Sequence, residues 1–119
     1  MSSIRQEKFA RQVQRDLSKI LQEKTHSWFD GTMYMVNEVS VTPDLGNAKI
    51  YIGCLSANNK EEAMSILEFY SRDIRKLLAA ELKNQVKKIP ELTFIYDDTL
   101  EKALKMEALL HKLNPPTTE

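Results

Sequence analysis

The chain has 119 residues, of which 42% are apolar, and its 17 lysines and arginines balance 17 aspartates and glutamates to a net charge of zero. This length supports one hydrophobic core, and the composition excludes an intrinsically disordered chain. The longest apolar run, at residues 33–36, is far shorter than the roughly 20 residues of a membrane span. The amino terminus mixes charges of both signs, and the single cysteine forms no internal disulfide. We therefore expect one soluble, cytoplasmic domain that does not bind membranes.

The first segment has the spacing of an amphipathic helix. Apolar side chains recur every three or four positions, at Phe9, Val13, Leu17, Ile20 and Leu21. The opposite face carries a basic stripe, formed by Lys8, Arg11, Arg15 and Lys19. A solvated helix face and a phosphate-binding face are both open interpretations of this stripe.

A β-hairpin is predicted after a polar connection at residues 25–31. Residues 33–42 alternate as a strand, and residues 48–55 form a second strand with Ile50, Ile52 and Cys54 on one face. The turn between them, at residues 43–47, contains proline and aspartate together with a glycine and an asparagine that tolerate positive φ. Cys54 is expected to be a small core residue rather than a nucleophile.

A long helical segment follows, and Asn58 or Asn59 is its predicted cap. Its apolar face is predicted at Ala63, Ile66, Leu67, Tyr70, Ile74, Leu77 and Leu78. Beyond Leu78 the apolar pattern drifts by about 100 degrees to Leu82 and Val86. This drift predicts two helical pieces with a bend between them.

The remaining chain is predicted to form a strand and a helix. Pro90 ends the helical structure, and Leu92, Phe94 and Tyr96 alternate as a third strand. Asp98-x-x-Glu101 is a possible capping box for a last helix, with apolar positions at Leu100, Ala103, Leu104, Leu110 and Leu113. The order of elements predicts an α+β domain over residues 1–113, with helices on one face of a three-stranded sheet, followed by a loose tail at 114–119.

Few residues suggest catalysis. The sequence has no glycine-rich phosphate loop and no His or Cys pair at metal-ligand spacing, so no cofactor, metal or small-molecule substrate is expected. His26 and His111 are expected to be structural or exposed. Asp97 and Asp98 could hold a metal, but a helix cap is the favoured interpretation. Trp28 and Phe29 are expected to cover the core, with base stacking as the alternative.

Positive charge is concentrated in two blocks despite the neutral total. Residues 1–24 carry six positive and three negative charges, and residues 71–90 carry six and two. The second block includes Arg72, Arg75, Lys76, Lys83 and Lys87. Clustered lysines and arginines bind phosphate backbones. An RNA-binding surface is therefore one hypothesis, and a protein-interaction module that docks an acidic partner is the other.

Three ordered blocks of the sequence resemble the ribosome-binding factor A family, from about Arg5 to Leu110. They are Arg5-Gln6-Glu7-Lys8-Phe9; then Val39, Thr42-Pro43-Asp44-Leu45 and Ala48-Lys49-Ile50-Tyr51; then Ile74-Arg75 with Leu78, followed by Pro90-Glu91-Leu92-Thr93-Phe94 and Asp97. The family has a helical kink at an Ala-x-Gly triplet, where this chain has Tyr70-Ser71-Arg72, so the position of the bend stays open between these residues and the segment after Leu78.

The resemblance implies a type II KH-like fold, with the order α-β-β-α-α-β and a further C-terminal helix. It also implies a non-enzymatic monomer that binds the small (30S) ribosomal subunit and its 16S rRNA precursor during late rRNA folding and 5′-end maturation. Phosphate contacts are then expected from Arg72, Arg75, Lys76, Lys83 and Lys87, with Lys8, Arg11, Arg15 and Lys19 as a second patch.

Overall fold

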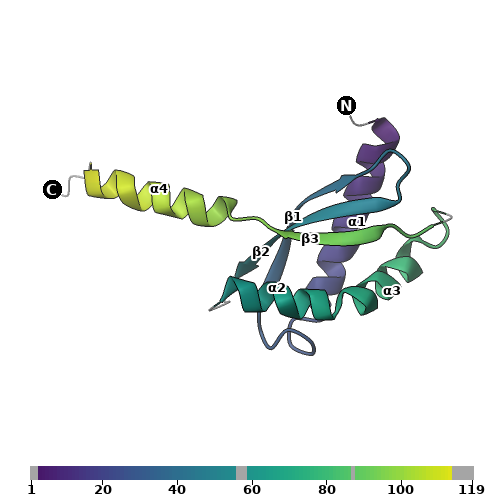
Figure 1. Ribbon diagram of the computed structural model, residues 1–119, viewed down its shortest axis with the longest axis horizontal. Coiled ribbons are helices and arrows are strands. Elements are labelled where there is room, and N and C mark those ends of the chain that lie inside the picture. The colour runs from purple at the N-terminus through teal and green to yellow at the C-terminus, as the bar shows by residue number, and fades with distance from the viewer. Residues whose placement is uncertain (1–2, 56–58, 87, 114–119) are drawn as a thin grey trace.

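The structure is a computed structural model that describes residues 3–55, 59–86 and 88–113 (Figure 1). Its elements are α1 (Ile4–Glu23), β1 (Met33–Val41), β2 (Asn47–Leu55), α2 (Lys60–Phe69), α3 (Ser71–Leu82), β3 (Glu91–Tyr96) and α4 (Thr99–Leu113). This order confirms the predicted α+β class, with a hairpin, a broken helix and a third strand.

The three strands form one sheet with β2 in the centre. β2 pairs antiparallel with β1 and parallel with β3. A parallel pair needs a crossover connection, which α2 and α3 supply. Both ends of β3 are attached to the hairpin, because the Glu91 amide donates to the Gly46 carbonyl at 2.9 Å and the Asp97 amide donates to the Ile52 carbonyl at 2.8 Å.

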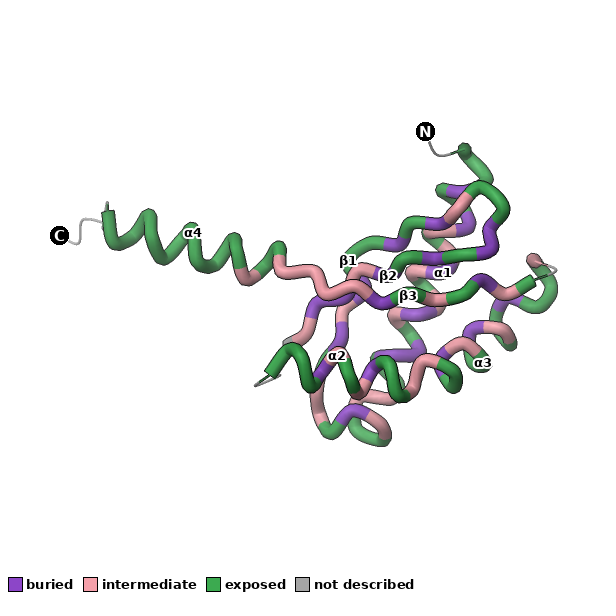
Figure 2. The backbone as a smooth tube through the Cα atoms, in the orientation of Figure 1, coloured by how far each residue is buried: buried purple, intermediate pink, exposed green. Residues whose placement is uncertain are grey.

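The hydrophobic core lies between one face of this sheet and the layer of α1, α2 and α3 (Figure 2). The sheet contributes Tyr34, Val36, Val39, Val41, Ala48, Ile50, Ile52 and Phe94. All five predicted apolar residues of α1 are buried. Leu77 of α3 was also predicted to lie on an apolar face, but it is 36% exposed. Side chains on the other sheet face, such as Ser40, Lys49 and Thr93, are exposed.

The first turn of α1 is tied to the end of β1 by a polar contact that the hydrophobic pattern did not reveal. Ser3 and Gln6 form a reciprocal capping box. The buried Gln6 side chain also donates from Nε2 to the Val41 carbonyl at 3.0 Å. Gln6 therefore fixes where α1 begins relative to the sheet.

The β1–β2 turn differs from its prediction in one respect. Asp44 bonds its own backbone as expected, accepting from the Gly46 amide at 2.9 Å. The positive φ, however, falls on Leu45 at 59° rather than on Gly46 or Asn47. A left-handed conformation costs a leucine roughly 1–2 kcal/mol. Burial of the Leu45 side chain in the core offsets this cost.

The helical segment breaks at Tyr70, earlier than the apolar drift predicted. Asn59 caps α2 by accepting from the amides of Glu61 and Glu62, while Asn58 lies outside the described residues. Tyr70 has φ −91° and ψ 3°, which separates α2 from α3. Of the two positions that the sequence left open for the bend, the one at residues 70–72 is observed; α3 continues past Leu78 to Leu82, and both leucines are fully buried.

Helix α4 is the one element that leaves the helical layer. It extends away from the sheet (Figure 1), and none of its residues is buried. The expectation that its apolar positions join the packed layer is wrong for Leu100, Ala103, Leu104, Leu110 and Leu113, which are all exposed. Within the described residues, no helix combines the length and apolar character needed to cross a bilayer.

Because none of the residues of α4 is buried, a chain ending at Asp98 should keep nearly the stability of the whole protein. We expect its midpoint of thermal unfolding to lie within about 4 °C of the full chain. Phe94→Ala is the control, since it removes a buried ring and should cost about 3–5 kcal/mol. Circular dichroism measures both. A large fall in the midpoint of the shortened chain would mean that α4 packs on the domain.

Candidate nucleic-acid interface

A line of basic side chains runs along the solvent side of α3. Arg72, Lys76 and Lys83 are exposed. Lys83 follows the helix but keeps helical angles, with φ −54° and ψ −30°. At 3.6 residues per turn, spacings of four and seven residues place the three side chains within about 40 degrees of one another. They lie opposite the buried Ile74, Leu78 and Leu82, so their charges point away from the core. We call these three residues the α3 stripe.

Arg75 has a structural role that the sequence pattern did not suggest. Its guanidinium donates from Nη2 to the Ile89 carbonyl at 2.8 Å and from Nε to the Pro90 carbonyl at 3.1 Å. It also pairs with the Glu91 carboxylate at 3.5 Å. These bonds hold the segment that leads into β3, so the Arg75 side chain has a structural role. Lys87 lies outside the described residues.

The predicted basic stripe of α1 is exposed along its whole length, at Lys8, Arg11, Arg15 and Lys19. Arg15 donates to the Gln12 side chain at 2.9 Å. None of these four residues, nor any of the α3 stripe, forms an ion pair with another described residue. Their charges are therefore available to a solvent-borne anion.

A shallow groove of about 270 Å³ lies between the first turns of α1 and the residues that follow α3. It is lined by Arg5, Lys8, Phe9 and Gln12 from α1, by Leu45 from the turn, and by Gln85 and Val86 after α3. Gln85 follows Lys83 by two residues. The groove therefore brings the first basic turn of α1 next to the end of the α3 stripe, an association that the sequence could not show.

The other end of the α3 stripe meets a cluster of aromatic rings at the helix break. Trp28 stacks on Tyr70 with a centroid distance of 4.7 Å and an interplanar angle of 4°. Phe29 contacts both Tyr70 and Tyr34 edge-to-face, and Lys24 lies over the Trp28 ring at 4.8 Å. Phe29 is 1% exposed. The prediction that Trp28 and Phe29 cover the core is confirmed.

One member of this cluster, Phe69, was not identified from the sequence. Its ring lies 5.0 Å from the Tyr70 ring, edge-to-face. At 78% exposure it is the most exposed large apolar side chain among the described residues. Phe69 falls outside the apolar stripe of α2. An aromatic residue on the polar side of a helix was the signal that could have revealed it.

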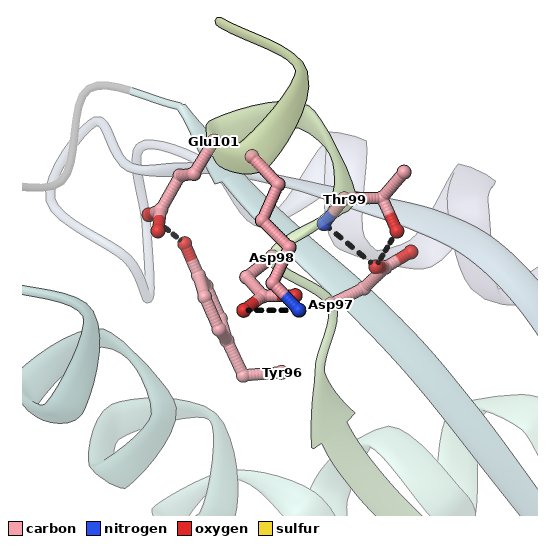
Figure 3. A network of polar contacts seen from close by, with 6 residues as sticks. Tyr96, Asp97, Asp98, Thr99 and Glu101 are labelled. Carbon is pink, nitrogen blue, oxygen red and sulfur yellow. Dashed lines mark hydrogen bonds and ion pairs between the residues drawn. The ribbon is translucent and has the colours of Figure 1, made fainter. Parts of the chain in front are cut away.

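Groups that could perform catalysis are held in structural roles. Burial raises the pKa of the Cys54 thiol to about 11, so it is protonated at neutral pH. Asp97 accepts from the Thr99 amide and hydroxyl and from Asn37, and these hydrogen bonds lower its pKa (Figure 3). This confirms a capping role for Asp97. The Glu101 carboxylate accepts from the Tyr96 hydroxyl, and Asp98 pairs with Lys102 at 3.6 Å. His26 and His111 are exposed, as predicted.

The part of the chain that the structure describes holds no group of three or more His, Cys, Asp or Glu side chains able to share a metal ion. The described surface therefore offers two basic stripes and one exposed aromatic ring. The two stripes can bind a polyanion.

Comparison with known proteins agrees with this arrangement. A sequence profile described as ribosome-binding factor A matches residues 5–110. The chain belongs to the ribosome-binding factor A family. A ribosome-binding factor A from Chlorobaculum parvum is 38% identical over 109 residues, which cover 91% of this chain and 89% of that protein.

Solved structures of the ribosome-binding factor A family share the fold. The crystal structure of the protein from Thermus thermophilus superposes with a TM-score of 0.64 at 19% identity, covering 76% of this chain and 94% of that one. A Thermus thermophilus homology model fitted into the cryo-EM map of a 30S complex gives 0.59 at 20% identity, covering 74% and 90%. These matches confirm the predicted KH-like fold.

The structural role of Arg75 predicts a stability difference between neighbouring basic residues of α3. Arg75→Lys keeps the charge but loses the planar fork that bonds two carbonyls, so it should cost about 1–3 kcal/mol. Lys76→Ala should change stability by no more than about 0.5 kcal/mol. Urea unfolding measures both. Equal, small costs would show that Arg75 does not support the connection to β3.

Proposed function

We propose that this chain binds the small ribosomal subunit through its 16S rRNA precursor, assists late rRNA folding and 5′-end maturation, and has no catalytic activity of its own. The observation that carries the proposal is the α3 stripe. It presents three exposed cations, without ion pairs to other described residues, on one side of α3 from the helix break to the end of the helix. KH domains engage nucleic acid at the junction of two helices, which is where this stripe begins.

The charge of the helical layer supports this placement. α2 contains one lysine and three glutamates, whereas α3 contains three basic residues and two acidic ones, Asp73 and Glu81. The net charge therefore changes from −2 in α2 to +1 in α3. An RNA backbone is repelled along α2 and attracted along α3. Family membership and the small-subunit complex formed by the Thermus thermophilus relative favour ribosomal RNA as the polyanion.

Charge reversal of each stripe tests this arrangement. The triple variant Arg72→Glu, Lys76→Glu, Lys83→Glu should abolish cosedimentation with free small subunits. The matched variant Arg11→Glu, Arg15→Glu, Lys19→Glu should weaken it less, because that stripe lies away from the helix break. Both sets are exposed, so the fold should be preserved. Equal losses from the two variants would place the RNA on another part of the surface.

RNase treatment of the subunits separates this function from the alternative of an acidic protein partner. Binding that survives removal of accessible RNA would favour the protein-interaction module. Binding through phosphates should also depend steeply on salt. On a plot of the logarithm of affinity against the logarithm of salt concentration, each phosphate contact contributes a slope of about −0.7 to −0.9. A nearly flat salt dependence would contradict phosphate contacts.

The finer role in assembly predicts a cold-sensitive phenotype. Misfolded RNA helices rearrange more slowly at low temperature, so a factor that guides their folding matters more there. Deleting the gene should slow growth chiefly in the cold and raise the pool of free small subunits that carry immature rRNA ends. Sucrose-gradient profiles and mapping of rRNA 5′ ends measure this. Normal profiles and processing in the cold would exclude the assembly role.

A further inference from the structure

We infer that Phe69 is a base-stacking residue that binds an unpaired nucleobase of the RNA whose phosphates contact the α3 stripe. The inference rests on the proposed function and adds a site to it. Its ligand is the flat face of a base, and the neighbouring Arg72 is the first phosphate contact.

The exposure of Phe69 is the first argument. A large aromatic side chain that is 78% exposed keeps at least one face of its ring open to solvent. Phe69 lies outside the buried face of α2, which is formed by Ala63 and Leu67, so its ring points away from the core. An open aromatic face of this kind is available for stacking by a base from solvent.

The second argument is that the ring is held by a connected set of aromatic contacts. Phe69 packs edge-to-face on Tyr70, Tyr70 stacks on Trp28, and Phe29 anchors both in the core. Fixing a side chain before binding reduces the conformational entropy lost on binding. The cluster thus supports one side of an open ring, and stacking on aromatic rings is how single-stranded bases are bound without regard to sequence.

The third argument is the alignment of Phe69 with the cations. The two helices meet at Tyr70, whose amide donates to the Ile66 carbonyl at 3.2 Å at the end of α2 and whose carbonyl accepts from the Ile74 amide at 2.8 Å in the first turn of α3. Phe69 and Arg72 flank this junction, three residues apart, and both side chains are exposed. Beside Arg72 a depression of about 340 Å³ opens between α3 and β3, lined by Ser71, Arg72, Arg75, Glu91 and Leu92. Arg72 thus lines a hollow just past the helix break, and Phe69 is the last residue of α2 before it.

The acidic character of α2 argues against a polyanion that continues past Phe69. The glutamates at 61, 62 and 68 would repel phosphates on that side. A protein partner attracted by these glutamates would be basic and would be repelled by the α3 stripe. An RNA strand that ends or turns at Phe69 avoids both repulsions. Its phosphates lie along the α3 stripe, and only a base, stacked on the Phe69 ring, lies near the glutamates of α2.

The test measures binding of fluorescent oligoribonucleotides by anisotropy at fixed salt, with cosedimentation on free small subunits in parallel. The probes are a ten-nucleotide oligoadenylate and a ten-unit abasic ribose-phosphate chain. Phe69→Ala should weaken binding of oligoadenylate by about 5- to 150-fold. It should leave abasic binding and the salt slope unchanged. Phe69→Trp should bind within about threefold of the wild type.

Two variants serve as controls. Leu104→Ala removes an exposed apolar side chain of α4 and should bind like the wild type. Phe69→Leu keeps apolar bulk without an aromatic face and should lose most of the preference for oligoadenylate over the abasic chain. Because Phe69 is exposed, all its variants should fold, which circular dichroism checks.

The failure modes are distinguishable. Wild-type binding to neither subunits nor oligoadenylate would overturn the proposed function and this inference with it. Wild-type binding to subunits alone would overturn only the inference, as would wild-type affinity in Phe69→Ala or equal losses on both oligomers. Loss of subunit binding with unchanged oligoadenylate binding would show that Phe69 contacts a ribosomal protein, which also overturns base stacking.

Discussion

The stacking of Trp28 on Tyr70 fixes the point at which the helical layer changes direction. Tyr70 has the near-zero ψ of the sparsely populated bridge region, a conformation that persists when surrounding contacts determine it. Trp28 comes from the connection after α1, so the stack links the end of the first helix to the junction of the next two. Through this contact α1, α2 and α3 cover a twisted sheet as one layer. The direction of α3, and with it the direction of the α3 stripe, depends on it.

The neutral net charge of the protein is compatible with RNA binding because its charges are separated by element. The described cations of α1 and α3 lie on the outer side of the helical layer, while α2 carries an excess of glutamate. Within a few ångströms of a surface, the local field rather than the total charge attracts a polyanion. A protein with no net charge also has little non-specific attraction to RNA at long range. RNA binding through the proposed stripes would then depend on their geometry, which favours a defined position over general adhesion.

Periodicity predicted the elements well because each one has a single buried face. The spacing of Phe9, Val13 and Leu17, and the alternation of Ile50 and Ile52, directly reflect which side meets the core. The position of the helix break could not be predicted in this way, since it depends on a contact between residues 28 and 70 that only the tertiary fold creates.

The same limit applied to the candidate site. Arg75 belonged to a basic cluster in sequence, but its carbonyl partners come from the approach to β3. The apolar residues of α4 matched a packed helix, yet none of its residues is buried, and the contacts observed along it are local: the Asp97 cap and the pair of Asp98 with Lys102.

The departure from the Ala-x-Gly triplet has a physical explanation in this structure. Small residues allow a helix to kink because they remove side chains from the inside of the bend. Here Tyr70 occupies the first position of the triplet, and its ring stacks on Trp28 at the bend. The third position is then regular helix within α3, where a glycine would cost about 1 kcal/mol and an arginine is well accommodated. Holding the bend with an aromatic contact therefore leaves position 72 available for a cation and position 69 for an exposed ring, both at the junction where a KH-like fold meets nucleic acid.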